Sequence, residues 1–338
     1  PQGPWYSANE YSKLHLAIAY LAVTDDRDFL REDVAGKTVL AHLNDFALFW
    51  KTLVRPGRSL ADYGEAKNLL ECVPTYIHEV PSFNAANVWM MRELAAINEV
   101  RGDAATASTL RAEAEQLLPH VLALYEPSQG IWNTLHRDGT RFPSRHVFDF
   151  ATIGLTIPDA LTPDMRRDMM RFVQKDLLTS TWMRAQSHSD PSARNSDRPD
   201  HGPMGAFSAW PAEVAAVFCD FGHYREAVDI YRRLARLLDE GPFSQSRELL
   251  GRDNDAPVRI ALRGWQTYNA SCSGALAETL LRHLFAFHPK PLADDPWANF
   301  VDSTDRAFEG ELRNIRFREK LLHLRLTPAG LSHTVSAP

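Results

Sequence analysis

Apolar residues recur every three or four positions along most of the chain, with polar residues between them. The clearest of these stretches lie at 39–53, 83–97, 110–124, 214–221, 227–238 and 276–284. Such spacing places the apolar side chains on one face of an α-helix, where they can pack against a core. The pattern therefore predicts a mainly helical protein with roughly nine or ten amphipathic helices.

The segments between these stretches alternate in character. Short, turn-like connections lie at 24–27, 101–103 and 221–223. Long, polar and aromatic-rich connections lie at 55–82, 127–146, 178–210 and 239–267. Long connections inside a compact domain are commonly functional. We therefore predict helical hairpins arranged as a toroid, with tight turns at one rim and functional loops at the other.

Strand-like alternation of apolar and polar residues occurs in two places. Near the end of the chain, residues 312–318 and 321–327 alternate, which predicts short β-strands. Residues 130–136 alternate too and run into a polar turn, which predicts a hairpin inserted between helices. We therefore expect a helical domain over residues 1–300 and a β appendage over residues 301–338.

The order of these segments resembles that of the six-hairpin (α/α)6-barrel glycoside hydrolases, particularly the bacterial relatives of trehalase and processing α-glucosidase. Phe83–Leu94 is similar to the asparagine-bearing inner helix of that family, and Leu124–Asn133 is similar to its "LWDEETGLYYD" segment. His201–Trp210 is similar to its "GPxWxxxN" segment, and Gly241–Gly251 takes the place of its "GFxEYYDP" segment. The resemblance extends over about residues 5–290.

This resemblance implies an all-α (α/α)6 toroid of helical hairpins. The helical stretches are fewer than a closed six-hairpin barrel requires, so we expect the ring to be incomplete in this chain. We also expect that an N-terminal β-sandwich domain, which often precedes such barrels, is missing from it.

The resemblance further implies a glycosidase, exo-acting and inverting, with a plant or microbial oligosaccharide as its substrate. Glycoside hydrolysis needs one carboxylic acid to protonate the leaving oxygen and one carboxylate to activate water or attack. In the similar family the base precedes the last inner helix, which corresponds to Glu248. The acid precedes the asparagine-bearing helix, which corresponds to Asp62 or, alternatively, to Glu71.

Aromatic and amide side chains accompany these acids in the predicted loops and helix ends. Flat rings stack on the apolar faces of sugars while their polar tips form hydrogen bonds. We therefore predict a sugar-binding pocket formed by Trp5, Tyr63, Asn84, His201, Trp210, Gln245, Arg263, Trp265, Gln266, Tyr268 and Asn269.

Two other functions are compatible with the sequence. A sugar epimerase or uronate lyase would use histidine or tyrosine for proton transfer, for which His146, His188 and His201 are candidates. A non-catalytic carbohydrate-binding helical domain is the other alternative, because a fold does not determine a function. No HExxH or CxxC motif occurs, so we expect neither a metal nor a cofactor.

Composition narrows the class of protein. Its 338 residues include 37 Lys and Arg against 43 Asp and Glu, a formal net charge of −6. No basic block stands out, which argues against nucleic-acid binding. No apolar run approaches the roughly 20 residues needed to cross a bilayer, so we expect no membrane partner. The N-terminus has no signal-peptide pattern, and we expect a cytoplasmic rather than a periplasmic or secreted protein.

Overall fold

The computed structural model describes residues 5–71, 73–179, 183–196, 201–203, 205–207, 209–238, 249–251, 257–259, 271–293, 306 and 308–337. Nine α-helices lie within these residues. Six of them coincide with the predicted stretches: α2 (Val39–Leu48), α3 (Pro81–Val100), α4 (Ala104–Leu122), α7 (Trp210–Asp220), α8 (Tyr224–Leu238) and α9 (Ser271–Thr279). The other three are α1 (Asn9–Thr24), α5 (Val147–Thr156) and α6 (Pro163–Phe172).

Short helical turns extend or connect these helices. They are the 3-10 turns η1 (Phe29–Arg31), η2 (Phe49–Leu53), η3 (Ala66–Asn68), η4 (Pro158–Ala160) and η6 (Ala193–Asn195), and the π-helical turns η5 (Val173–Leu177) and η8 (Leu280–Leu284). The π-helical turns continue α6 and α9 directly.

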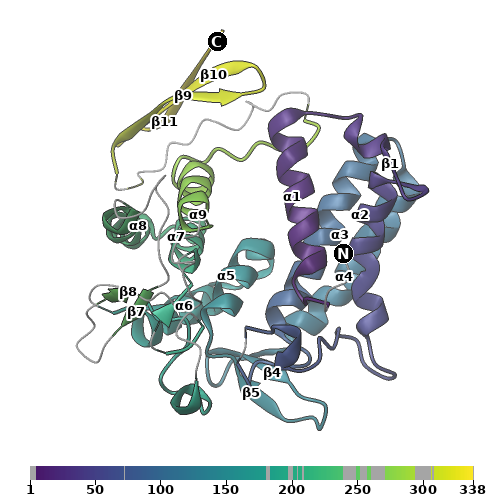
Figure 1. The fold of residues 1–338 in the computed structure, drawn as a ribbon, viewed down its shortest axis with the longest axis vertical. Helices are drawn as coiled ribbons and strands as arrows, with labels where there is room; N and C mark the ends of the chain where they lie inside the picture. The colour runs from purple at the N-terminus through teal and green to yellow at the C-terminus, as the bar shows by residue number, and fades with distance from the viewer. Residues whose placement is uncertain are drawn as a thin grey trace.

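The helices pack as hairpins around a centre. Helix α3 packs along α4, and α7 packs along α8, while α1, α3, α5, α7 and α9 contact one another in that order. Figure 1 shows this series turning about the middle of the molecule, with α2 and α4 outside it on the right and α8 outside it on the left. Residues of α1 and α9 also approach each other, with His15 Nε2 3.9 Å from Glu278 Oε1. The predicted toroid of helical hairpins is confirmed.

The hairpin of α3 and α4 shows how the sequence sets these elements. Pro81 occupies the first turn of α3, where its missing N–H costs no hydrogen bond. Gly102 adopts a φ of 85°, which reverses the chain after α3. Asp103 then caps α4 by accepting a hydrogen bond from the Thr106 N–H at 3.0 Å. Helix α3 is buried on nearly all sides, as an inner helix should be.

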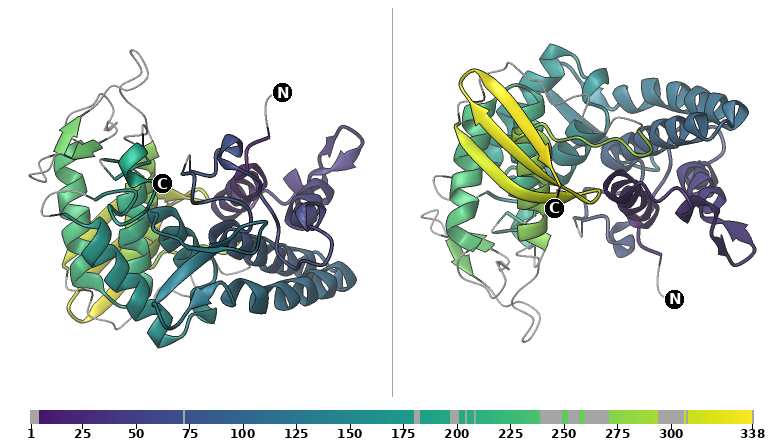
Figure 2. Two further views of the ribbon diagram at one scale, coloured as in Figure 1. Left: turned by 90° about the horizontal axis from the view of Figure 1, so that it is seen from below. Right: turned by 90° about the horizontal axis from the view of Figure 1, so that it is seen from above.

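The predicted β appendage is also confirmed. It is an antiparallel sheet in the order β11 (Gly330–Ser336), β10 (Lys320–Thr327), β9 (Gly310–Phe317). Figure 2 shows this yellow sheet lying over the helices of the α7–α9 side. The Phe317 ring packs edge-on against Phe287 at 4.9 Å, and Arg318 Nη2 donates to the Ala22 carbonyl of α1 at 2.9 Å. The sheet therefore contacts both ends of the helical series.

The remaining strands are short. The predicted inserted hairpin is present as β4 (Ile131–Leu135) and β5 (Arg141–Pro143), joined on its other edge by β3 (Tyr125–Glu126). The other strands are β1 (Asp33–Val34), β2 (Lys37–Thr38), β6 (Gly205–Ala206), β7 (Leu249–Gly251) and β8 (Pro257–Arg259). Among the described residues, no helix combines the length and apolar character needed to cross a membrane.

Candidate active site

A cavity of about 730 Å³ lies between the helices of the central series. Its volume falls in the range of about 300–1,000 Å³ that is usual for small-molecule sites. The described residues around it include the aromatic side chains of Tyr11, Trp89, Phe148, Phe207 and Trp210. They also include three acids, Glu71, Glu213 and Glu278, which come from a loop, from α7 and from α9. Rings and carboxyl groups therefore face the same space.

Glu71 and His201 meet at the wall of this cavity. Glu71 is buried and follows η3 in a left-handed backbone conformation, with a φ of 51°. Such a conformation is uncommon for a residue with a side chain and is often found at functional sites. The Nδ1 atom of His201 lies 3.0 Å from Glu71 Oε2 and can donate a hydrogen bond to it. The His201 ring also packs edge-on against Trp210, with 5.0 Å between the ring centres.

His146 forms hydrogen bonds with backbone groups next to this pair. Its Nδ1 atom accepts a hydrogen bond from the Phe148 N–H at the start of α5, 3.1 Å away. Its Nε2 atom lies 3.1 Å from the His201 carbonyl oxygen, to which it donates. Burial lowers the pKa of His146 to about 3, so the ring is neutral at physiological pH. We conclude that His146 positions the backbone of His201.

Within the described part of the chain, two groups of side chains have the spacing of metal ligands. Glu71, His146 and His201 have potential ligand atoms within 4.8 Å of one another, as do Asp220, His283 and His288. In the first group, both nitrogens of His146 already bind backbone groups.

In the second group, His283 Nδ1 donates to Asp220 Oδ1 at 2.7 Å. Burial, followed by the nearby His283, Arg282 and Arg306, lowers the pKa of His288 to about 3. His146 and His283 already form hydrogen bonds within the protein, and we assign no metal to either group.

Asp62 does not line the central cavity. Its Oδ2 atom lies 2.8 Å from Arg55 Nε and accepts a hydrogen bond from Arg137 Nε at 2.8 Å. Its Oδ1 atom accepts hydrogen bonds from the Gly64 N–H at 2.8 Å and from His78 Nδ1 at 3.0 Å. Burial alone would raise the pKa of Asp62, but these hydrogen bonds outweigh it and lower the pKa. Asp62 is thus held as a carboxylate by structural partners.

Three predicted sugar-binding residues lie beside Asp62 and not around the cavity. The Trp5 ring stacks on Tyr63, with 6.2 Å between ring centres and 7° between planes. The Asn84 side chain accepts from the Ala61 N–H at 2.9 Å and donates to the Val80 carbonyl at 2.9 Å. The hydrogen bonds of Asn84 attach the loop that carries Asp62 to helix α3.

Other predicted site residues divide into two sets. His201 and Trp210 line the cavity, as does Glu71. The remaining predictions lie outside the described residues: Gln245, Glu248, Arg263, Trp265, Gln266, Tyr268 and Asn269.

Glu213 lies on the inner helix α7 and was not predicted from the sequence as a site residue. Burial first, then the charges of Glu278 and Glu71, raise its pKa to about 8. A signal was present in the sequence, because Glu213 is a single acid within the otherwise uncharged run 210–219. A charged residue in such a run must find a partner or a cavity. Glu278 and Arg282 of the α9 region, which form an ion pair at 2.8 Å, were not predicted either.

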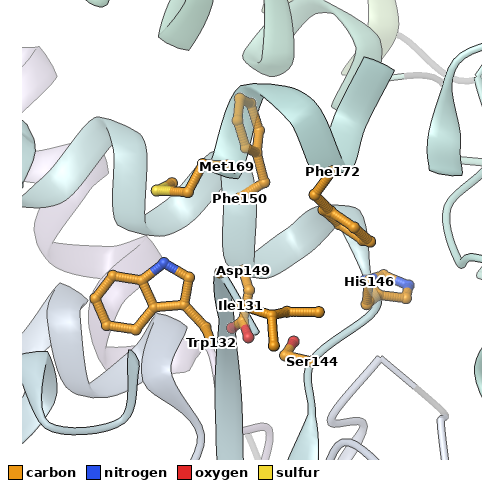
Figure 3. Close-up of a pocket in the computed structure, with 9 residues that line it drawn as sticks. Ile131, Trp132, Ser144, His146, Asp149, Phe150, Met169 and Phe172 are labelled. Carbon is orange, nitrogen blue, oxygen red and sulfur yellow. The ribbon is translucent and has the colours of Figure 1, made fainter. Parts of the chain in front are cut away.

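A second, much smaller pocket of about 20 Å³ lies between β4 and α5. Figure 3 shows the Asp149 carboxyl group in it beside Ser144, with the rings of Trp132 and Phe172 to either side. Asp149 Oδ1 accepts a hydrogen bond from the Ser82 N–H at 3.0 Å, and burial raises the pKa of Asp149 to about 6. Asp149 therefore caps the start of α3. The pocket beside it has the volume of about one water molecule.

This chain is similar to known proteins in its fold and not in a recognisable sequence pattern. No protein-family model matches the sequence, and no curated protein matches it. Among solved structures, a protein named sialidase is similar, with a TM-score of 0.68, 13% identity, and coverage of 98% of this chain and 31% of that one. The GH78 family rhamnosidase of Bacillus sp. GL1 is similar with a TM-score of 0.62, 13% identity, and coverage of 98% and 32%. The fold is shared with two glycosidases.

The chain spans about a third of the length of these two proteins. At 13% identity, the likeness shows the arrangement of the helices and sheet and not the chemistry of the site. What the site can do therefore depends on its own groups. These are three carboxyl groups, an imidazole bound to one of them, and several aromatic rings.

Proposed function

We propose that the protein is a glycosidase that binds an oligosaccharide in the central cavity. The observation that supports this most directly is the convergence of Glu71, Glu213 and Glu278 on one cavity lined by aromatic rings. Cleavage of a glycosidic bond needs a carboxyl pair across a sugar-sized space, and ring stacking orients the sugar between them. The names of the two structural neighbours are consistent with this chemistry.

Glu71 is our candidate for the first member of the carboxyl pair. It is the predicted acid that faces the cavity, whereas Asp62 is bound by arginine and histidine side chains elsewhere. The hydrogen bond from His201 fixes the orientation of the Glu71 carboxylate. The second member predicted from the sequence resemblance is Glu248.

We also propose that the enzyme is exo-acting and inverting, on a plant or microbial oligosaccharide. Both properties are inferred from the resemblance to the six-hairpin glycoside hydrolases. Inversion requires a water molecule between the two carboxyl groups, which then lie roughly 6.5–9.5 Å apart. Retention would require a separation of roughly 5–5.5 Å.

The charges around the cavity favour a neutral sugar. Arg282 is the one Arg or Lys among the described lining residues, and it is already paired with Glu278. A sugar carboxylate would therefore find no unpaired Arg or Lys among these residues and would face the acid Glu71 at an electrostatic cost. The two neighbours are named for different sugars, so their shared fold does not select the substrate.

A panel of aryl glycosides and oligosaccharides tests the proposal, with NMR of the products. We expect release of a free sugar, and the anomer formed first reports inversion or retention. Glu71→Gln should reduce turnover by about 10²–10⁴-fold, the usual contribution of an acid or base group. Glu32→Gln is the matched control, because Glu32 is exposed and does not line the cavity.

One observation supports a second candidate, a sugar epimerase or uronate lyase. His201 faces the cavity and its Nδ1 atom is bound to Glu71, so its imidazole can move a proton. His146 has both nitrogens occupied, and His188 is exposed outside the cavity lining. In the same assay, an unsaturated or isomerised product without cleavage would favour this candidate. Sugar binding without any turnover would favour a non-catalytic domain.

A further inference from the structure

Glu213 occupies a distinctive position in the cavity. It lies on α7, one helical turn after Trp210, and both side chains line the cavity. Among the described residues, its carboxyl group has no hydrogen bond or ion pair, whereas Glu71 is bound to His201 and Glu278 to Arg282. Of the three acids, it is therefore the one whose carboxyl group is left for a ligand.

We propose that Glu213 is the proton donor of the glycosidase and that Glu71 is its ionised partner. This inference rests on the proposed function and changes the roles that the sequence resemblance implies, in which Asp62 or Glu71 donates the proton and Glu248 activates water. The assignment follows from the different surroundings of the two acids. An N–H group facing Glu71 stabilises a carboxylate, and the lack of a donor at Glu213 favours the neutral acid.

The reaction balances with these two groups and one water molecule. As the bond between the anomeric carbon and the glycosidic oxygen breaks, Glu213 transfers its proton to that oxygen and becomes a carboxylate. Water forms the new bond to the anomeric carbon and gives up a proton to Glu71. Proton exchange with solvent then restores both groups, so that glycoside and water yield a sugar and an alcohol.

The surroundings of Glu213 keep its proton in place at neutral pH. The titratable and charged groups that line the cavity with it come from α1 and the residues before it, from the α9 region and from two loops: Tyr6, Tyr11, His15, Glu71, His201, Glu278, Arg282 and His283. Burial and the neighbouring carboxylates raise the pKa of Glu213 to about 8. A general acid must be protonated near its working pH, which this surrounding provides.

Leaving-group dependence provides the test. A dinitrophenyl glycoside releases a phenolate that needs no proton, whereas an alkyl glycoside releases an alkoxide that does. Glu213→Gln should therefore lower turnover of the alkyl glycoside by about 10²–10⁴-fold and leave that of the dinitrophenyl glycoside close to wild type. Glu71→Gln should lower both. Equal losses on both substrates in Glu213→Gln, or no loss on either, would overturn the role of Glu213.

Further measurements distinguish a loss of the proton donor in Glu213→Gln from a folding defect. Circular dichroism and the Tm of Glu213→Gln should match the wild type, and Glu213→Asp should recover part of the alkyl glycosidase activity. On the alkyl glycoside, the alkaline limb of the wild-type pH profile, near pH 8, should be absent from the residual activity of Glu213→Gln.

The wild-type protein decides the proposed function separately. If it cleaves glycosides but Glu213→Gln shows no dependence on the leaving group, only this inference fails. If it cleaves none of them, the proposed function fails and this inference fails with it. Loss of both activities in Glu248→Gln, with Glu71→Gln unaffected, would assign the ionised role to Glu248 and overturn that part of the proposal.

Discussion

The Nδ1 atom of His201 lies 3.0 Å from Glu71 Oε2, although the two residues are 130 positions apart in the chain. The loop before α3 supplies the acid, and the segment before α7 supplies the imidazole. His146 holds the backbone of His201 through a contact of 3.1 Å to its carbonyl oxygen. The orientation of one cavity acid thus depends on three segments of the chain.

His201→Phe should lower turnover without abolishing it. The substitution removes the N–H that orients Glu71 but keeps an aromatic ring against Trp210. A hydrogen bond to a charged group contributes about 1.5–3 kcal/mol, which corresponds to a loss of roughly 10–150-fold in kcat. Steady-state kinetics would measure this, with His188→Phe as an exposed control. Complete loss of activity would instead indicate that His201 itself transfers a proton.

Asp62→Asn should destabilise the fold much more than it affects chemistry at the cavity. The carboxylate lies between Arg55, Arg137 and His78, and its side chain is 2% exposed. Breaking a buried ion pair costs about 3–5 kcal/mol, and we expect the lower part of this range because both arginines are partly exposed. Urea unfolding would measure the loss.

Asp45→Asn provides the matched control for Asp62, because its ion pair with Lys37 is exposed and should contribute no more than about 1 kcal/mol. The pKa of Asp62 is lowered in the folded protein, so its stabilising effect is complete at neutral pH. That effect should disappear as the pH falls below the unfolded pKa of about 3.9 and through the lower folded value. An equal effect of the two substitutions would contradict the structural role of Asp62.

Acidification should destabilise the protein already above pH 5, in part through His146. Its folded pKa of about 3 lies below the unfolded value of about 6.5, so the unfolded chain binds a proton that the folded protein does not. Stability is therefore lost as the pH falls from about 6.5 toward 3, with a slope of at most about 1.4 kcal/mol per pH unit.

His146→Asn should reduce this slope while retaining a side chain that can cap α5. Unfolding free energies measured between pH 7 and pH 5 would show the change. His188→Asn should leave the slope as it is in the wild type, since His188 is exposed. If the two variants changed the slope equally, His146 would not be the neutral buried group described above.

Gly154→Ala tests the packing of the inner helices α5 and α7. A Cβ atom at this position would lie 2.5 Å from Val217 Cγ1, so the helices would have to move apart. Overpacking of this kind costs about 1–3 kcal/mol, and adding Val217→Ala should recover part of the loss. Gly274→Ala on α9 is the control, because a Cβ there meets nothing within 4 Å. That change should stabilise by roughly 0.5–1 kcal/mol. Equal Tm shifts in the two glycine variants would contradict the close contact.

Local patterns in the sequence determined the helical hairpins and the β appendage. The repeat of apolar residues determines which side of each helix is buried. A window of ten to twenty residues is enough to show this repeat. Turns such as the Gly102 turn between α3 and α4 follow from the same local information. Resemblance to a family added Glu71, His201 and Trp210, which the structure brings to one cavity.

The tertiary structure alone decided which acids face that cavity. Asp62 and Glu71 lie nine positions apart in one polar segment, and nothing local distinguishes them. Asp62 is bound by Arg137, a residue 75 positions away, and Glu71 by His201. Glu213 belongs to an apolar helix that would be read as core, yet its carboxyl group lines the cavity beside acids from distant segments. Charge, burial and proton affinity depend on neighbours in space, and packing places those neighbours from parts of the chain that no local pattern connects.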